Sequence, residues 1–342
     1  MKAIPVEEAV GKVLCHDITQ IVPGFFKGRA FKKGRIIQPD DVEKLLDLGK
    51  AHIYVFDMQS GTIHEDEAAH RIAIASAGSG LRLTDPAEGK VNLVATQNGL
   101  LTINTEALSR INAVEDIMFA TLHTHRHVQP DQPVGGTRII PLFTETKRIE
   151  AIEDIEDICQ EYFPVVQVKP FASLKVGIVT TGSEIYHGRI EDRFGPVLRK
   201  KFGELGSRVI DQIFVSDDIP MTVEAIHGLI RDGAQFVAVT GGMSVDPDDQ
   251  TPASIRAAGA EIITYGAPVL PGAMFMLAHI GDVPVVGLPG CVMYYGASIF
   301  DLVIPRMLAG ETISREDIVS LGHGGFCANC PECRYPNCPF GK

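Results

Sequence analysis

Two short apolar runs in the second half of the chain each end in a segment rich in glycine, hydroxyl and carboxylate groups. Residues 175–180 lead into TGSE at residues 181–184, and residues 236–239 lead into TGGMSVDPDD at residues 240–249. In an open parallel sheet, the loops that leave the carboxyl ends of the strands are where ligands bind. Backbone N–H groups at helix starts bind anions, and glycines allow the backbone to approach them closely. The two loops therefore predict one shared site for a phosphorylated ligand.

The acids in these loops need a separate explanation, because carboxylates repel a phosphate. Glu184, Asp246, Asp248 and Asp249 are compatible with such a ligand when a cation lies between the charges. Mg²⁺ is bound in this way, by one or two carboxylates together with phosphate oxygens and water. The alternative is structural, since Ser183 and the aspartates could cap the helices that follow. We expect Mg²⁺, with Asp248 as a possible ligand.

The last sixteen residues hold a second group of reactive side chains. Four cysteines are spaced C-x2-C-x2-C-x4-C, namely Cys327, Cys330, Cys333 and Cys338. Bacterial iron–sulfur proteins use a nearly identical run, and four thiolates also satisfy tetrahedral zinc. Because so short a segment has no core of its own, a metal would supply much of its folding energy. The tail therefore predicts an iron–sulfur cluster or Zn²⁺, and the alternative is an unstructured, redox-labile end.

Three histidines occur in LHTHRHV at residues 122–128. His123, His125 and His127 would lie on one face of a strand, because side chains of a strand alternate with a period of two. Three imidazoles could hold zinc. We favour a polar strand face or a basic patch for an anionic substrate, since strand neighbours seldom converge on one ion.

The elements that would position these groups indicate an α/β protein. Strands and helices alternate after an amphipathic helix at residues 146–163, which predicts a doubly wound, mostly parallel sheet. Short strands dominate before it. We expect N-terminal accessory modules ahead of the sheet, with this division: a small α+β module at 1–62, a strand-rich subdomain at 63–145, the α/β domain at 146–315 and the cysteine tail at 322–342.

Composition limits the classes of function. The chain has 342 residues, 45% hydrophobic and 22% charged, which is typical of a globular protein. It contains no apolar run long enough to span a membrane and no secretory signal pattern, so we expect a cytoplasmic protein without a membrane partner. A net charge of −12 argues against nucleic-acid binding. The oligomeric state stays open, with a homodimer among the possibilities.

Four segments carry a resemblance to a known family. TTGSEI is similar to its TGDEL, SDDIPMTVEAI to its aspartate-rich strand end and helix, TGGMSVDPDD to its GGxSxGxxD loop, and LPG at 270–272 and 288–290 to its KPG and LPGNP segments. In this order, residues 174–310 resemble the molybdopterin-binding fold of the molybdopterin molybdenumtransferases, the MoeA and gephyrin E-domain family. Residues 27–57 resemble a further segment of that family. Its SxMDGYA motif is absent, which removes one candidate acid.

The resemblance implies a role in molybdenum cofactor biosynthesis. The protein would bind molybdopterin or adenylylated molybdopterin and promote insertion of molybdate, or its tungsten counterpart, with release of AMP. Glu184, Asp246 and Asp249 would position the metal and assist cleavage of the phosphoanhydride. The pterin ligand would contact Thr181, Gly182, Ser183, Asp218, Gly241, Gly242, Ser244, Pro271, Gly272, Pro289 and Gly290. For Asp218 the alternative is a cap on the following helix.

Two other functions stay open. The competence/damage-inducible proteins, linked to nucleotide pyrophosphatase activity, carry a GGLGPTxDDxT loop, and GGMSVDPDDQTP resembles its ending. A pyrophosphatase acting on nucleotides or pterins could therefore use the same loop. LPGCV also departs from LPGNP, with Cys291 in place of asparagine. The third possibility is a carrier or sensor that binds the finished cofactor and docks a redox partner through the tail.

Overall fold

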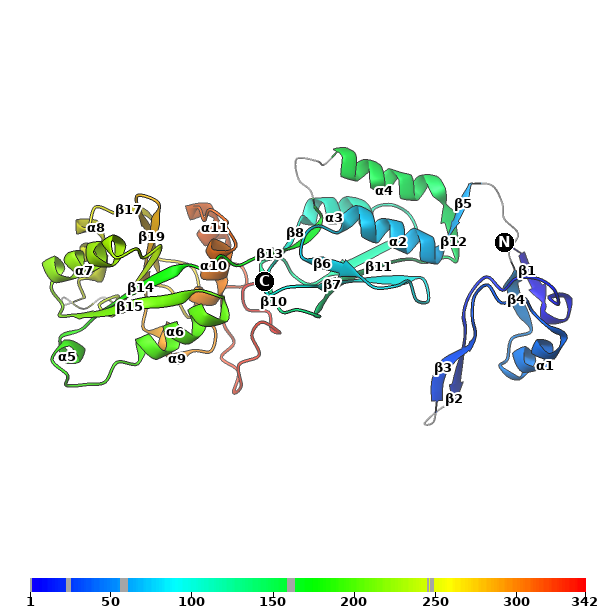
Figure 1. Cartoon of the computed structure of the whole chain (residues 1–342), viewed down its shortest axis with the longest axis horizontal. Coiled ribbons are helices and arrows are strands. Elements are labelled where there is room, and N and C mark those ends of the chain that lie inside the picture. The colour runs from blue at the N-terminus through cyan, green and yellow to red at the C-terminus, as the bar shows by residue number, and fades with distance from the viewer. Residues whose placement is uncertain (1, 23–25, 56–60, 159–163, 245, 247–248) are drawn as a thin grey trace. The chain divides into compact units, whose positions relative to one another are not determined.

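A computed structural model describes residues 2–22, 26–55, 61–158, 164–244, 246 and 249–342. The chain divides into two compact units (Figure 1). Unit 1 holds residues 1–96, 102–124 and 130–167, and unit 2 holds 97–101, 125–129 and 168–342. The predicted division into four parts stays a prediction.

Unit 2 is built on a six-stranded sheet with strand order β15-β14-β16-β19-β18-β17. The first three pairs are parallel, and β18 is antiparallel to both of its neighbours. The strands are β14 (Lys175–Thr181), β15 (Arg208–Val215), β16 (Phe236–Thr240), β17 (Glu261–Tyr265), β18 (Met276–Ile280) and β19 (Val283–Leu288). The predicted mostly parallel sheet is confirmed.

Helices cover both faces of this sheet, each with its own core. One core packs α6 (Phe194–Glu204) and α10 (Ile299–Leu308) on the sheet through side chains such as Phe202 and Phe300. The other packs α7 (Ile219–Arg231) and α8 (Thr251–Ala257), through side chains such as Leu229 and Ile255. The sheet is therefore doubly wound, as predicted. Its central strand β16 is buried throughout, which explains an apolar run without polar alternation.

The strand register places the ligand-binding loops at one edge. Thr181 of β14 pairs with Val215 of β15, and Thr180 pairs with Thr240 of β16. Thr240 also pairs with Leu288 of β19. Because these neighbouring strands are parallel and end at the same level, the loops that follow them emerge side by side.

Several boundaries in unit 2 differ from the prediction. The apolar pattern of residues 293–308 predicts one final helix, but the structure has α9 (Cys291–Tyr294) and then α10. The chain turns extended at Tyr295, which follows α9, and Ser298 begins α10 by forming a capping box with Asp301. Strand β18 and the helix α11 (Arg315–Ser320) were not predicted, and the short helix α5 (Ser183–Tyr186) follows β14.

Unit 1 combines antiparallel strands with helices. Its four-stranded sheet has the order β6-β7-β11-β9, and α2 packs on this sheet and on α4. The elements here are β6 (Leu81–Leu83), β7 (Lys90–Ala95), β9 (Ile117–Thr121), β11 (Pro133–Ile139), α2 (Glu65–Ser76), α3 (Thr105–Asn112) and α4 (Thr146–Ile158). The helix expected at 146–163 is thus seen to Ile158, packed within unit 1, and Cys159 lies outside the described residues.

The remaining strands form small sheets. Near the N-terminus, β1 pairs with β4 and β2 with β3, beside η1 and α1; β5 pairs with β12, and β8 lies between β10 and β13. Their bounds are β1 (Lys2–Pro5), η1 (Val6–Glu8), β2 (Ile18–Val22), β3 (Phe26–Phe31), α1 (Pro39–Asp47), β4 (His52–Val55), β5 (Thr62–His64), β8 (Gly99–Ile103), β10 (Arg126–Val128), β12 (Phe143–Glu145) and β13 (Val166–Pro170). Among the described residues, no helix has the length and apolarity to cross a bilayer.

Candidate functional site

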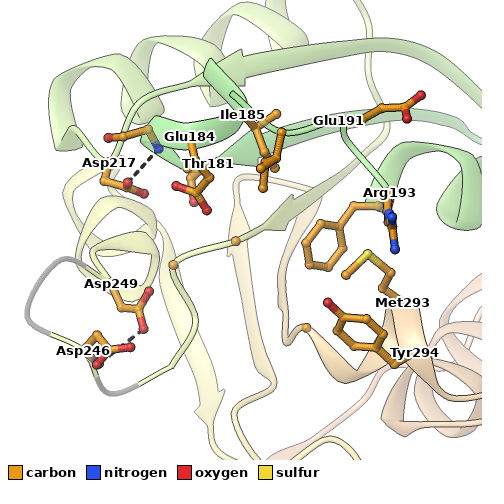
Figure 2. Close-up of a pocket in the computed structure, with 17 residues that line it drawn as sticks. Thr181, Glu184, Ile185, Glu191, Arg193, Asp217, Asp246, Asp249, Met293 and Tyr294 are labelled. Carbon is orange, nitrogen blue, oxygen red and sulfur yellow. Dashed lines mark hydrogen bonds between the residues drawn. The ribbon is translucent and has the colours of Figure 1, made fainter. Parts of the chain in front are cut away.

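A cavity of about 920 Å³ opens at the carboxyl edge of the unit 2 sheet (Figure 2). This volume is within the usual range of small-molecule sites, ~300–1,000 Å³. The loops after β14, β15, β16 and β19 all contribute. Its lining comprises Thr181, Gly182, Ser183, Glu184, Ile185, Ile190, Glu191, Arg193, Phe194, Asp217, Gly241, Gly242, Asp246, Asp249, Gly290, Met293 and Tyr294.

The loop after β14 bends sharply at Gly182. This residue has φ +143°, a conformation that favours glycine, and the carboxylate of Glu184 lies beside it. The N–H of Ser183 donates to Oδ2 of Asp217 over 2.8 Å, and its hydroxyl lies 2.9 Å from that of Ser216. The loops after β14 and β15 are therefore joined, and Asp217 is held at the cavity wall.

The loop after β16 requires both of its glycines. Gly241 and Gly242 have φ +82° and +52°, and a Cβ on Gly241 would lie 2.1 Å from the carbonyl oxygen of Thr181. Thr251 fixes the turn: its hydroxyl donates to the Gly241 carbonyl over 2.8 Å and lies 3.2 Å from the Thr181 hydroxyl. Close approach of the two loops thus depends on a residue without a side chain.

Asp246 and Asp249 lie together at the acidic end of the cavity (Figure 2). The Asp249 N–H donates to the Asp246 carbonyl over 3.0 Å, and the Asp246 N–H donates to Oδ2 of Asp249 over 3.3 Å. The structural alternative for Asp249 is not observed, because the N-cap of α8 is Gln250. Asp248 lies outside the described residues.

The opposite end of the cavity was not anticipated from the sequence. There Arg193 lies near Met293 and Tyr294, away from Asp246 and Asp249, with Glu191 on the same side (Figure 2). Phe194, the next residue along the chain, also lines the cavity. An aromatic and thioether surface with one guanidinium suits a flat heterocycle with polar edges. Arg193 and Phe194 lie in a stretch without a recognisable motif, and Met293 and Tyr294 directly follow the LPGCV segment. Asp217, in the loop after β15, was not among the predicted site residues either, although it is next to the predicted Asp218.

Several predicted ligand residues do not line the cavity. Asp218 is the N-cap of α7, accepting a hydrogen bond from the Met221 N–H over 2.8 Å, so its structural alternative is observed. Gly272, with φ +140°, packs against Ile299, to whose N–H the carbonyl of Pro271 is hydrogen-bonded. Ser244 and Pro289 are also outside the lining, whereas Gly290 is part of it.

A metal at this site would depend on the ligand. No three His, Cys, Asp or Glu side chains among the described residues are arranged to hold an ion. Mg²⁺ does not need such a cage, since phosphate oxygens and water complete its octahedron. The five carboxylates of the lining, against the single guanidinium, provide the hard oxygen donors that Mg²⁺ prefers.

The three histidines are not on one strand face, so that prediction is wrong. His123 and His125 lie in the turn between β9 and β10, and His125 has φ +58°. Burial, with the nearby Arg306 charge, lowers the pKa of His125, although Glu311 lies 3.5 Å away. His127 contacts Asn98. The four tail cysteines line a second cavity, of about 260 Å³.

Comparison with protein families identifies two segments. Residues 177–309 match the family described as "Probable molybdopterin binding domain", and residues 3–57 match a "Domain of unknown function (DUF8806)". The first segment contains the whole lining of the candidate site. The α/β domain is therefore similar to this family and has its fold.

The curated relatives are similar over part of the chain only. A "CinA-like protein" of Mycobacterium sp. (strain MCS) is 36% identical over 93 residues, which are 27% of this chain and 22% of the relative. A "CinA-like protein" of Mycobacterium leprae (strain TN) is 36% identical over 80 residues, 23% of this chain and 18% of the relative. The match thus spans about a fifth of these relatives.

Two solved structures, among others, are similar to part of this chain. MoaB, a "Molybdopterin biosynthesis enzyme" of a Thermus species, is 19% identical, with 40% of this chain and 98% of the other covered and a TM-score of 0.34. A "tungsten cofactor synthesizing protein MoaB" from Pyrococcus furiosus is 23% identical, with 35% and 84% covered and a TM-score of 0.31.

Proposed function

We propose that the cavity of unit 2 binds molybdopterin or its adenylylated form and promotes insertion of molybdate or tungstate, with release of AMP. The observation that supports this most is the cavity itself, which brings the two glycine loops and the carboxylates together. The family match of residues 177–309 agrees with a pterin ligand.

The phosphate of the ligand would lie at the glycine loops, because backbone donors are available there. Glu184 and Gly242 line the cavity, and their N–H groups donate no hydrogen bond to another described residue. Backbone N–H groups at a glycine turn and a helix start are donors for phosphate oxygens. The heterocycle would then lie toward Phe194, Met293 and Tyr294, where Arg193 can donate to a carbonyl or ring nitrogen.

A cation is needed because the carboxylates of the cavity would otherwise repel the phosphate. Glu184, Asp246 and Asp249, with Asp217, are the residues that would hold Mg²⁺, which neutralises the phosphate charge when bound. Glu184 is exposed at the cavity mouth, whereas Asp217 is fixed by the Ser183 N–H. Asp217 would therefore orient the loop after β14, and Glu184 would be free to turn toward the ligand.

The transferase assay is AMP release from adenylylated molybdopterin. We expect release that requires both molybdate and Mg²⁺, and a loss of about tenfold or more in Glu184→Gln or Asp249→Asn, since a charged contact contributes ~1.5–3 kcal/mol. Asp282→Asn is the control, because Asp282 is exposed in the turn between β18 and β19. Release that does not depend on molybdate would contradict the transferase.

A nucleotide or pterin pyrophosphatase is the second candidate. It is favoured by the identity to CinA-like proteins and by the DDxT ending of the β16 loop. It would hydrolyse dinucleotides without molybdate. A non-catalytic carrier would instead retain the pterin through purification and show neither reaction.

A further inference from the structure

The cysteine tail is anchored to unit 2 at both ends. At its start, Leu270 and Phe326 form a parallel bridge, with hydrogen bonds of 2.8 Å from the Leu270 N–H to the Gly325 carbonyl and from the Cys327 N–H to the Leu270 carbonyl. At its end, Phe340 is 3% exposed and belongs to the core that contains α10. The tail is therefore a docked segment, and the unstructured alternative does not describe it.

The middle of the tail is held through Tyr335 and through Asn337, whose side-chain oxygen accepts a hydrogen bond from Arg126. The hydroxyl of Tyr335 donates to the carbonyl of Asp301 in α10 over 3.0 Å, and burial raises the pKa of this phenol. Between residues 328 and 333, by contrast, the described chain has no backbone-to-backbone hydrogen bond. The cysteines thus lie on a loop whose ends are fixed and whose own backbone is unpaired.

All four cysteines line one cavity. Cys327 and Cys338 are half-buried against the core, whereas Cys330 and Cys333 are exposed, and all four are free thiols. Aromatic side chains make up much of the remaining wall, namely Tyr294, Tyr295, Phe326, Tyr335 and Phe340. Four thiols around an aromatic-walled hollow are an unusual arrangement for a purely structural tail.

The spacing of the cysteines favours a cluster over zinc. Tetrahedral zinc, with Zn–S distances of ~2.3 Å, needs its four sulfurs grouped around one ion. The four cysteines line one cavity of about 260 Å³, but no three His, Cys, Asp or Glu side chains of the described residues are grouped to hold a single ion. An iron–sulfur cluster places iron and sulfide between its cysteines, and the C-x2-C-x2-C-x4-C spacing nearly matches that of bacterial ferredoxins. We propose that Cys327, Cys330, Cys333 and Cys338 bind an iron–sulfur cluster in this cavity.

The proposed cluster would be a direct neighbour of the ligand cleft. Tyr294 lines both cavities, and Gly296 leaves room for Cys333, whose Sγ would lie 2.9 Å from a Cβ at that position. Lys201, which is paired with Asp301 over 2.6 Å, also donates to the carbonyl of Gly296 over 3.4 Å. A one-electron centre would therefore lie one side chain away from the pterin. This second part rests on the proposed function, whereas the cluster does not.

The cluster is tested on the full chain purified without oxygen. We expect iron and acid-labile sulfide in equal amounts and a visible absorption that dithionite bleaches. Cys330→Ser and Cys333→Ser should each lose both, and Cys291→Ser should retain them, because Cys291 lines neither cavity. Circular dichroism checks that each variant folds. A colourless protein with one zinc per chain, or one with no metal, overturns the proposal.

The two proposals can fail separately. A protein that binds pterin but contains no iron rejects the cluster and keeps the proposed function. A coloured protein that does not bind pterin rejects the function and keeps the cluster. If both hold, pterin binding should quench or shift the visible spectrum of the cluster. Tyr294→Ala should reduce that change without removing iron, measured at pterin concentrations that saturate the variant. A spectrum unaffected by bound pterin contradicts the coupling.

Discussion

At the scale of single residues, two adjacent aspartates have different tasks. Asp217 faces the cavity and accepts the Ser183 N–H, whereas Asp218 caps α7. Asp218→Ala should lower the unfolding free energy by ~1 kcal/mol, the usual contribution of an N-cap, and leave ligand affinity unchanged. Asp217→Asn should instead weaken ligand binding and leave the free energy of unfolding unchanged. Urea denaturation and pterin titration of both variants measure this, and equal effects of the two on affinity would contradict the assignment.

Gly241 illustrates a residue selected by contact as well as by backbone angle. Gly241→Ala would place a methyl group 2.1 Å from the Thr181 carbonyl, in addition to the cost of a positive φ. Gly206→Ala is the control, because Gly206 has φ +78° with nothing within 4 Å. We expect the control to lose ~1–2 kcal/mol and Gly241→Ala clearly more, measured by thermal and urea unfolding. Similar losses would mean that the close approach is relaxed in solution.

At the scale of elements, a buried arginine holds α10 to α11. Arg306, 7% exposed, donates to Glu311 over 2.8 Å and to Asp317 over 2.7 Å. Arg306→Met should cost on the order of 2–3 kcal/mol, below the ~3–5 kcal/mol of a fully buried pair, because Lys169 lies near Glu311. Urea denaturation checks this. Arg231→Met is the control, since the pair of Arg231 and Glu224 is exposed and contributes little.

The same contact predicts a pH dependence. Burial acts to raise the pKa of Asp317, but the hydrogen bonds from Arg306 and Ser314 outweigh it and lower the pKa to about 2. Because the pKa of Asp317 is lower in the folded protein than in the unfolded chain (~3.9), the ionised carboxylate stabilises the fold above about pH 4. This stabilisation is lost as the pH falls toward 2 and the carboxylate is protonated. Stability should therefore fall between about pH 4 and pH 2, less steeply in Asp317→Asn. Identical profiles for the two proteins would contradict this contribution.

The elements also show what the sequence could predict. The loops at 181–184 and 240–249 were expected to converge because apolar runs followed by glycine give strand ends at one edge of a parallel sheet. The break between α9 and α10 was not predicted, since MYYGASIF keeps an apolar pattern across it. Its sequence signal is the Ser298–Asp301 capping box, which begins α10. The Arg193 end was missed because no local pattern marks side chains that meet only after packing.

At the scale of the whole molecule, the protein is acidic and the proposed ligand carries an anionic phosphate. The chain has a net charge of −12, and its cavity carries five carboxylates. A dianionic phosphate is repelled by such a site at long range, so its affinity should depend on a divalent cation more than on salt.

Equilibrium binding of molybdopterin to the full chain, followed by pterin fluorescence with and without Mg²⁺, tests the account most directly. We expect binding that weakens at least tenfold when Mg²⁺ is chelated, and that loses this dependence in Glu184→Gln combined with Asp249→Asn. Affinity that is the same with and without Mg²⁺, or that survives in the double variant with its Mg²⁺ dependence intact, would contradict a phosphate held at the carboxylate end of this cavity.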